Sequence, residues 1–180
     1  MNPDDLLNSL DALIKDQTKD LLLPLRVDRG QSRENGEKFR APLTFTMDLP
    51  KKEDDTRLVP YILTQVLTGI DEQKSAEDPS SVCSVRIVVV LYCEDMGEGK
   101  RNVLNVITRL RMELLRRKII GKHFVLGDKI DWVVDPRPVS SYFSGEMLMN
   151  FSLPPIEPDD RLKNEDNYRE EGYLYAQEKC

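Results

Sequence analysis

The clearest hydrophobic pattern in this chain lies between residues 100 and 118, where apolar residues recur at intervals of three and four. This spacing predicts an amphipathic helix with one buried face. Arg116, Arg117 and Lys118 stand in its last turn, where cations complement the helix dipole. Residues 94–99 are expected to form a turn before the helix, and Gly121 to terminate it. The predicted buried residues are Val103, Leu104, Ile107, Leu110, Leu114 and Leu115.

Several segments around this helix have the composition of β-strands. Residues 82–92 are apolar on both sides at their centre, which predicts a central strand with a layer on each face, one of which a partner subunit could provide. Residues 71–81 are acidic and small, and are expected to form a flexible connection. The other predicted strands are 43–47, 59–69 with Pro60 at its start, 123–126 and 129–134 around Gly127-Asp128, and 142–153.

The two ends of the chain differ in character. Asp4 or Asp5 is expected to cap a first helix that runs to about Asp20 and carries an apolar stripe. Residues 157–180 hold eight acidic and four basic side chains and few aliphatic ones, so we expect a tail that is disordered alone. Tyr173 and Tyr175 are its candidate anchors on a partner. The stripe consists of Leu6, Leu7, Leu10, Leu13 and Ile14.

These elements predict an α/β fold of the α+β type. We expect a mixed or antiparallel sheet of about four to six strands, packed with one long central helix and an N-terminal helix. The expected organisation is an N-terminal helix over 1–24, an α/β core over 39–156 and an acidic flexible tail over 157–180. Residues 28–38 and 51–57 are expected to be loops.

Composition narrows the classes of partner. The chain has 180 residues and a formal net charge of −6, which argues against nonspecific nucleic-acid binding because such binding depends on Lys and Arg. The three cysteines, Cys83, Cys93 and Cys180, form no CxxC pair, so we expect free thiols rather than a zinc site. The start of the chain is acidic and unlike a signal peptide, and no apolar run approaches the length of a membrane span. We therefore expect a cytoplasmic protein without a membrane partner.

Candidate reactive groups are few. Gly97-Glu98-Gly99-Lys100 suggests a phosphate-binding loop, but Glu94 stands where the first glycine of that motif is needed and Arg101 replaces its Ser or Thr. His123 is the single histidine and has no neighbouring residues that complete a triad. The acidic residues at 94, 95 and 98 lack the spacing of a calcium loop. We expect no catalytic residue, no cofactor and no metal.

Candidate interface residues come from two groups. The basic residues of the helix, with Lys122, could contact phosphate or form salt bridges between subunits. Aromatic residues dominate interface hot spots, and Tyr142 and Phe143 fit either an interface or the core, whereas Trp132 is expected in the core. The candidate interface residues are Tyr142, Phe143, Glu146, Arg109, Arg116, Arg117, Tyr173 and Tyr175.

The order of these segments resembles tail terminator (tail completion) proteins of long-tailed bacteriophages that infect Gram-positive bacteria. The resemblance covers residues 59–158 and lies in the conjunction of motifs rather than in any one of them. The motifs are Val59-Pro60-Tyr61-Ile62-Leu63, the strand Val85 to Val90 with Tyr92 and Glu94-Asp95, the helix Asn102 to Arg111, and Tyr142-Phe143-Ser144-Gly145-Glu146-Met147 with Pro154.

The resemblance implies a structural virion protein that forms a ring, expected to be hexameric, at the head–tail junction. Such a ring caps the tail tube, ends its polymerisation and provides the surface that joins the head. The implied partners are further copies of the chain, the tail tube protein and a head-completion or connector protein, while genomic DNA passes the pore without specific binding. Another neck component, or a host soluble adaptor that uses the tail as a ligand, stays an alternative.

Overall fold

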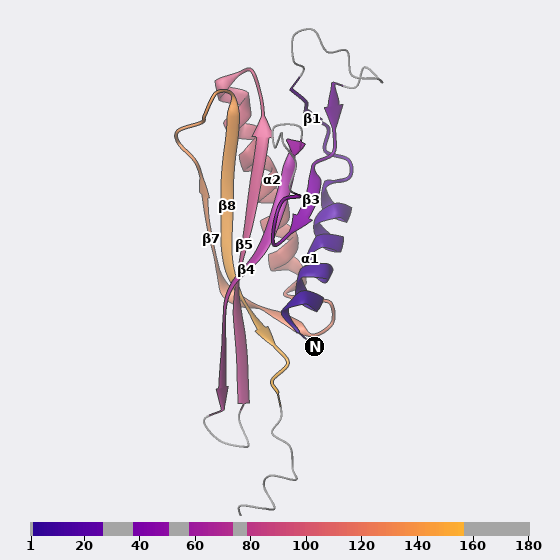
Figure 1. Cartoon of the computed structure of the whole chain (residues 1–180), viewed down its shortest axis with the longest axis vertical. Helices are drawn as coiled ribbons and strands as arrows, with labels where there is room; N and C mark the ends of the chain where they lie inside the picture. The colour runs from indigo at the N-terminus through magenta and orange to yellow at the C-terminus, as the bar shows by residue number, and fades with distance from the viewer. Residues whose placement is uncertain (1, 27–37, 51–57, 74–78, 157–180) are drawn as a thin grey trace, which may run out of the picture.

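The computed structural model describes residues 2–26, 38–50, 58–73 and 79–156. It contains a six-stranded mixed sheet in the order β3-β4-β5-β8-β7-β6, in which only the β3–β4 pair is parallel. A separate small sheet pairs β1 with β2. Two helices complete an α+β fold, which confirms the predicted fold class (Figure 1). The elements are α1 (Pro3–Thr18), β1 (Leu23–Pro24), β2 (Phe39–Arg40), β3 (Leu43–Thr46), β4 (Tyr61–Gln73), β5 (Pro79–Tyr92), α2 (Met96–Arg117), β6 (Ile119–Ile120), β7 (Phe124–Val134) and β8 (Tyr142–Leu153).

Helix α2 begins earlier than its apolar pattern predicted. The carboxylate of Asp95 accepts hydrogen bonds from the backbone N–H groups of Gly97 and Glu98, both at 2.8 Å, and so caps the helix. The expected turn at residues 94–99 is therefore wrong, because residues 96–99 form the first helical turn. The helix ends at Arg117, and Lys118, whose φ is 59°, is its C-cap, so the helix terminates before the predicted Gly121.

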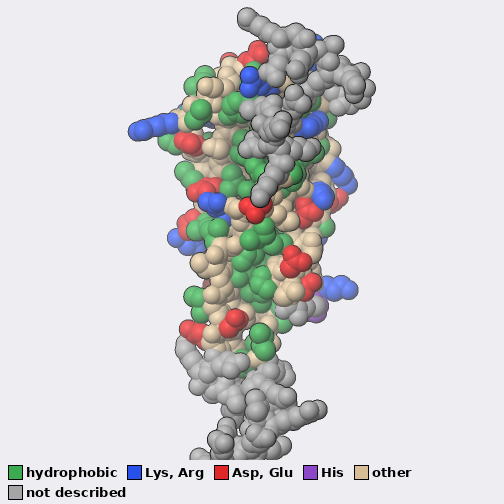
Figure 2. Space-filling model, viewed as in Figure 1, with side chains coloured by type: hydrophobic (Ala, Val, Ile, Leu, Met, Phe, Trp, Pro, Cys, Tyr) green, Lys and Arg blue, Asp and Glu red, His purple; other side chains and the backbone are tan. Residues whose placement is uncertain are grey.

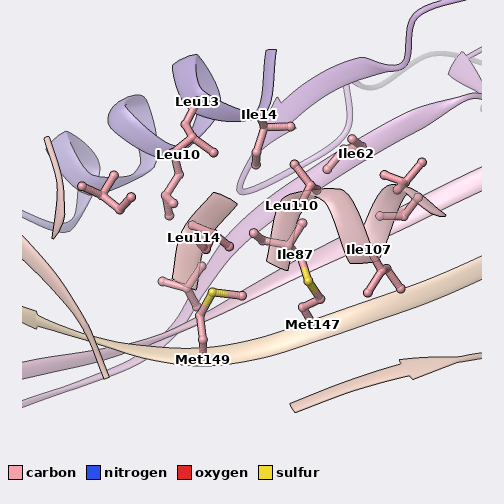
Figure 3. Packing of buried hydrophobic residues seen from close by; sticks show 14 of the residues in the cluster. Leu10, Leu13, Ile14, Ile62, Ile87, Ile107, Leu110, Leu114, Met147 and Met149 are labelled. Carbon is pink, nitrogen blue, oxygen red and sulfur yellow. The ribbon is translucent and has the colours of Figure 1, made fainter. Parts of the chain in front are cut away.

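The hydrophobic core lies between α2, α1 and one face of the sheet (Figure 3). Leu104 and Leu115 were predicted inside this core but are 39% and 42% exposed. Val106 and Glu113 occupy buried positions on α2 instead. Residues that meet in the core include Ile107, Leu110 and Leu114 of α2, Leu10 and Ile14 of α1, Ile87 of β5, and Met147 and Met149 of β8.

Helix α1 buries the predicted stripe but is capped differently. The side chain of Asn2 accepts from the N–H of Asp5 at 2.9 Å, and the carboxylate of Asp5 accepts from the N–H of Asn2 at 2.9 Å. This capping box makes Asn2 the cap, so the expected caps Asp4 and Asp5 belong to the first turn. The helix ends at Thr18, whose hydroxyl donates to the carbonyl of Ile14.

Four strands differ from their predicted bounds. Residues 71–73 and 79–81, expected in a flexible connection, belong to β4 and β5, whose hairpin projects beyond the helices (Figure 1). The two strands expected around Gly127-Asp128 are one strand, β7, with a register shift between Leu126 and Ile130. Strand β3 ends at Thr46, before the predicted Met47. The predicted loops lie almost wholly, and the predicted tail wholly, outside the described residues.

Candidate subunit interface

One face of the six-stranded sheet is covered by the two helices, whereas no described helix covers the other. We call this second face the open face. Strand β5 shows the difference directly, because Val85, Ile87 and Val89 are buried while Arg86, Val88 and Val90 alternate with them and are half-exposed. The central strand that looked apolar on both sides therefore has a protein layer on only one side among the described residues.

The open face carries a mixture of apolar and polar side chains. Val88 and Glu146 are register partners, as are Arg86 and Leu148, so these four lie together on β5 and β8. Leu148 is 42% exposed at the centre of the sheet. Figure 2 views this face, and hydrophobic side chains gather along its middle with most of the charged groups at its margins. This composition is typical of a protein interface.

A polar cluster crosses the open face. Arg86 donates to the side-chain oxygen of Gln65 through Nε at 3.1 Å and Nη2 at 2.7 Å. Its Nη1 lies 3.9 Å from Oε2 of Glu146, so the candidate Glu146 is the carboxylate beside this guanidinium. Ser84 donates to Asn150 at 2.7 Å further along the same strands. The cluster offers a partner hydrogen-bonding groups that are already oriented.

A shallow pocket of about 320 Å³ lies at one end of the open face. Its walls combine apolar groups with the carboxylates of Asp135 and Glu146. A pocket of this size accommodates a large side chain from a partner. Its remaining lining residues are Val88, Val133, Pro136, Ser144 and Gly145.

The aromatic candidates are separated by the structure. Phe143 was expected either at an interface or in the core, and it belongs to the core because it is only 1% exposed. Tyr142 is half-exposed on the open face, where its ring meets that of Tyr92 edge-on at 5.5 Å and its hydroxyl accepts from Nη1 of Arg26 at 2.9 Å. Tyr142 therefore lies on the surface available to a partner. Tyr173 and Tyr175 lie outside the described residues.

The basic candidates of α2 make contacts within the chain. Arg109 donates two hydrogen bonds, of 2.8 and 3.0 Å, to the carboxylate of Asp20 and so connects α2 to the segment after α1. These bonds hold the pKa of Asp20 below its usual value. Arg117 and Arg116 both donate to the shielded carboxylate of Glu113 and lower its pKa. Glu113 stands three residues before Arg116 and four before Arg117, and this helical spacing could have indicated the two ion pairs from the sequence.

Trp132 was expected in the core but is 44% exposed. Its register partner is the buried Met147, so the indole lies on the helix side of the sheet, at the β7 edge. The guanidinium carbon of Arg111 is 5.2 Å from the centre of its ring, which is a cation–π contact. A tryptophan at a sheet edge lacks a second neighbouring strand to bury it.

The segments that carry the candidate reactive groups belong to a helix and to an exposed turn. Gly97-Glu98-Gly99-Lys100 forms the first turn of α2, and Nζ of Lys100 donates to the carbonyl of Pro136 at 3.0 Å. His123 is exposed in the turn between β6 and β7. Within the described ranges, no three His, Cys, Asp or Glu residues gather as a metal site would require. Burial raises the pKa of the Cys83 thiol.

No family model and no curated protein matches the chain. The helices of the described part are all too short or too polar to cross a membrane.

Proposed function

We propose that this chain is a structural virion protein at the head–tail junction of a long-tailed phage. In this proposal, copies of the chain form a ring, with six as the expected number, that caps the tail tube and ends its polymerisation. The opposite side of the ring receives a head-completion or connector protein. The ring assembles in the host cytoplasm, and the acidic chain lets genomic DNA pass without specific binding. The proposal assigns the chain no reaction and no cofactor.

The observation that carries this proposal is the open face of the sheet. Leu148 and Val88 leave apolar surface exposed on this face, and a neighbouring subunit is the simplest source of a layer that would bury it. The two edges of the sheet differ, since β3 covers only Tyr61–Thr64 of β4 and β6 covers only the start of β7. Closed rings use two different surfaces of each subunit, so this asymmetry suits them better than a two-fold dimer. The motifs that resemble tail terminators point to the tail junction as the place.

The proposal is tested by adding the purified chain to tail tubes and imaging the tube ends. We expect a closed ring of several copies at one end and an arrest of tube growth. A single copy, or a two-fold dimer, at that end contradicts the ring. Binding to the connector but not to the tube identifies another neck component instead.

A variant of the open face sharpens this test. Leu148→Glu places a charge at the centre of the face on a side chain that is 42% exposed, so the monomer should fold. Leu22→Glu is the matched control, because Leu22 is 70% exposed in the segment that follows α1. We expect Leu148→Glu to abolish ring formation and the control to preserve it. Equal capping by both variants would show that the open face is not the interface.

A further inference from the structure

Among the described strands, only the short β6 pairs with the outer edge of β7. Strand β6 pairs only with Phe124 and Val125, and the N–H of Leu126 donates to the carbonyl of Lys118 at 2.8 Å. From Gly127 to Val134 no described strand lies against this edge. Unpaired edges expose backbone N–H and C=O groups, and proteins usually cover them or protect them with charges.

Exposed apolar groups of α2 adjoin this edge. Leu104, Arg111 and Leu115 are spaced by seven and four residues, so they share one side of the helix. Arg111 reaches the ring of Trp132 from that side, which places the three residues next to β7. We call Leu104, Arg111, Leu115, Trp132 and the outer edge of β7 the α2–β7 surface.

The charge of this surface is mainly positive. Lys100 and Lys118 lie on the same side of α2 as Arg111, and Lys129 lies on β7. Lys118 is 3.7 Å from Asp128 in an exposed and therefore weak pair. Lys129 pairs with Asp131 at 2.9 Å on the other side of β7, because Asp131 is the register partner of Leu148 on the open face. Among the described residues, Arg111 has no carboxylate partner. Three cations on the helix side, Lys100, Arg111 and Lys118, thus lie beside one carboxylate, that of Asp128, which favours an acidic ligand that carries apolar groups.

The last 24 residues of the chain, 157–180, have this chemistry. Their eight acidic and four basic side chains give a net charge of −4, and their apolar anchors are Tyr168, Tyr173, Leu174 and Tyr175. They follow β8 at its Leu153 end, where Ser152 pairs with Val125 at the start of β7. Residues 157–172 span up to about 50 Å when extended, and the unpaired part of β7 is about 26 Å long, so Tyr173 and Tyr175 can reach all of it.

We infer that the C-terminal tail of the same chain docks on the α2–β7 surface. Residues 168–177 lie along the outer edge of β7, with Tyr173 and Tyr175 over Trp132 and Leu115 and the acidic residues near Arg111 and Lys118. Attachment to the same chain gives the tail a high effective concentration, so contacts that are individually weak suffice. The docked tail covers the edge that would otherwise pair with other chains. This inference does not depend on the proposed ring.

Trp132 makes the inference measurable, because it is the only tryptophan of the chain and lies at the centre of the surface. We compare tryptophan emission and acrylamide quenching of the full chain with those of a chain that ends at residue 156. Removing the tail should shift the emission to longer wavelength and raise the quenching constant about twofold, since two tyrosines no longer cover the indole. Tyr173→Ser with Tyr175→Ser should reproduce the truncation.

Charge variants provide the control. With Arg111→Glu, the full and shortened chains should differ little, because the cation that receives the acidic tail is lost. Lys15→Glu makes the same charge change on α1, beside the other edge of the sheet, and should preserve the whole difference. Dilution should not change the signal of the full chain; a loss on dilution would assign the docked tail to a second copy. Identical Trp132 emission and quenching with and without the tail would overturn the inference.

Discussion

Replacing Gly99 with alanine should destabilise the chain, although the same change stabilises most helices. Gly99 is buried in the first turn of α2. A methyl group there would come closer than 3.0 Å to three atoms of the Phe143 ring. Phe143 is 1% exposed, so its ring has no free space to enter. The substitution therefore sets helix propensity against packing.

The packing effect should dominate. Alanine gains at most about 1 kcal/mol over glycine within a helix, and less near the end of one. Overfilling a packed core costs about 1–3 kcal/mol. The expected result is a net loss of about 1–2 kcal/mol, equivalent to roughly 2–8 °C in the melting temperature of a chain of this size.

Urea unfolding followed by circular dichroism measures this loss. Gly97→Ala is the matched control, since Gly97 lies in the same turn and its added methyl would meet only the side chain of Asp95 at 3.3 Å. The control should stay within about 0.5 kcal/mol of the natural chain. Phe143→Leu should cost less in the Gly99→Ala background than alone, because the smaller side chain relieves the overlap. If Gly99→Ala is as stable as the natural chain, or if Phe143→Leu costs the same in both backgrounds, the argument from overlap is refuted.

Three further predictions concern stability and chemistry. The hydrogen bonds from Arg117 and Arg116 lower the pKa of Glu113 from its usual 4.5 in the folded chain. The ionised Glu113 therefore contributes to the free energy of unfolding above that value, and this contribution is lost as the pH falls through the lower folded pKa. Glu113→Gln should reduce the melting temperature at about pH 7 and much less at about pH 3. Met147→Ala removes a fully buried side chain and should cost about 2–5 kcal/mol, whereas Met112→Ala at an exposed position should cost under about 0.5 kcal/mol in the same urea titration. Lys100→Ala should leave stability within about 0.5 kcal/mol, with no ATP hydrolysis before or after the change; turnover that the variant abolishes would contradict the non-catalytic proposal.

The sequence predicted the fold best where a periodic pattern reached the end of an element. Strand β8 matches its prediction at 142–153 because Tyr142 and Pro154 mark clear limits. The start of α2 was missed because the glycines at 97 and 99 resemble a turn. The Asp95 carboxylate caps the helix despite them, and its hydrogen bonds to the N–H groups of Gly97 and Glu98 can be recognised only in the structure. The polar ends of β4 and β5 were missed because their pairing with each other, rather than burial, holds them extended.

The candidate interface was predicted less well, because exposure depends on which strand lies at an edge. A centre of aliphatic residues in β5 indicated two covered faces, yet the strand order leaves one face open among the described residues. Trp132 has the sequence surroundings of a core residue, and only the position of β7 near the edge exposes it. Arg86 gave no signal in the sequence, since its role arises from Gln65 and Glu146 on the neighbouring strands.

The open face and the α2–β7 surface have separate roles in the proposed assembly. The open face must stay accessible for a neighbouring subunit, whereas an uncovered β7 edge favours indiscriminate pairing between chains. A tail that covers the edge but not the open face would keep the free chain in solution without blocking the proposed interface. The chain shortened at 156 should therefore self-associate more than the full chain, and Leu148→Glu should not reverse this, because the two surfaces lie on opposite sides of the sheet. Sedimentation of the full chain, the shortened chain and the shortened Leu148→Glu chain tests this separation, and a shortened chain that stays monomeric argues against it.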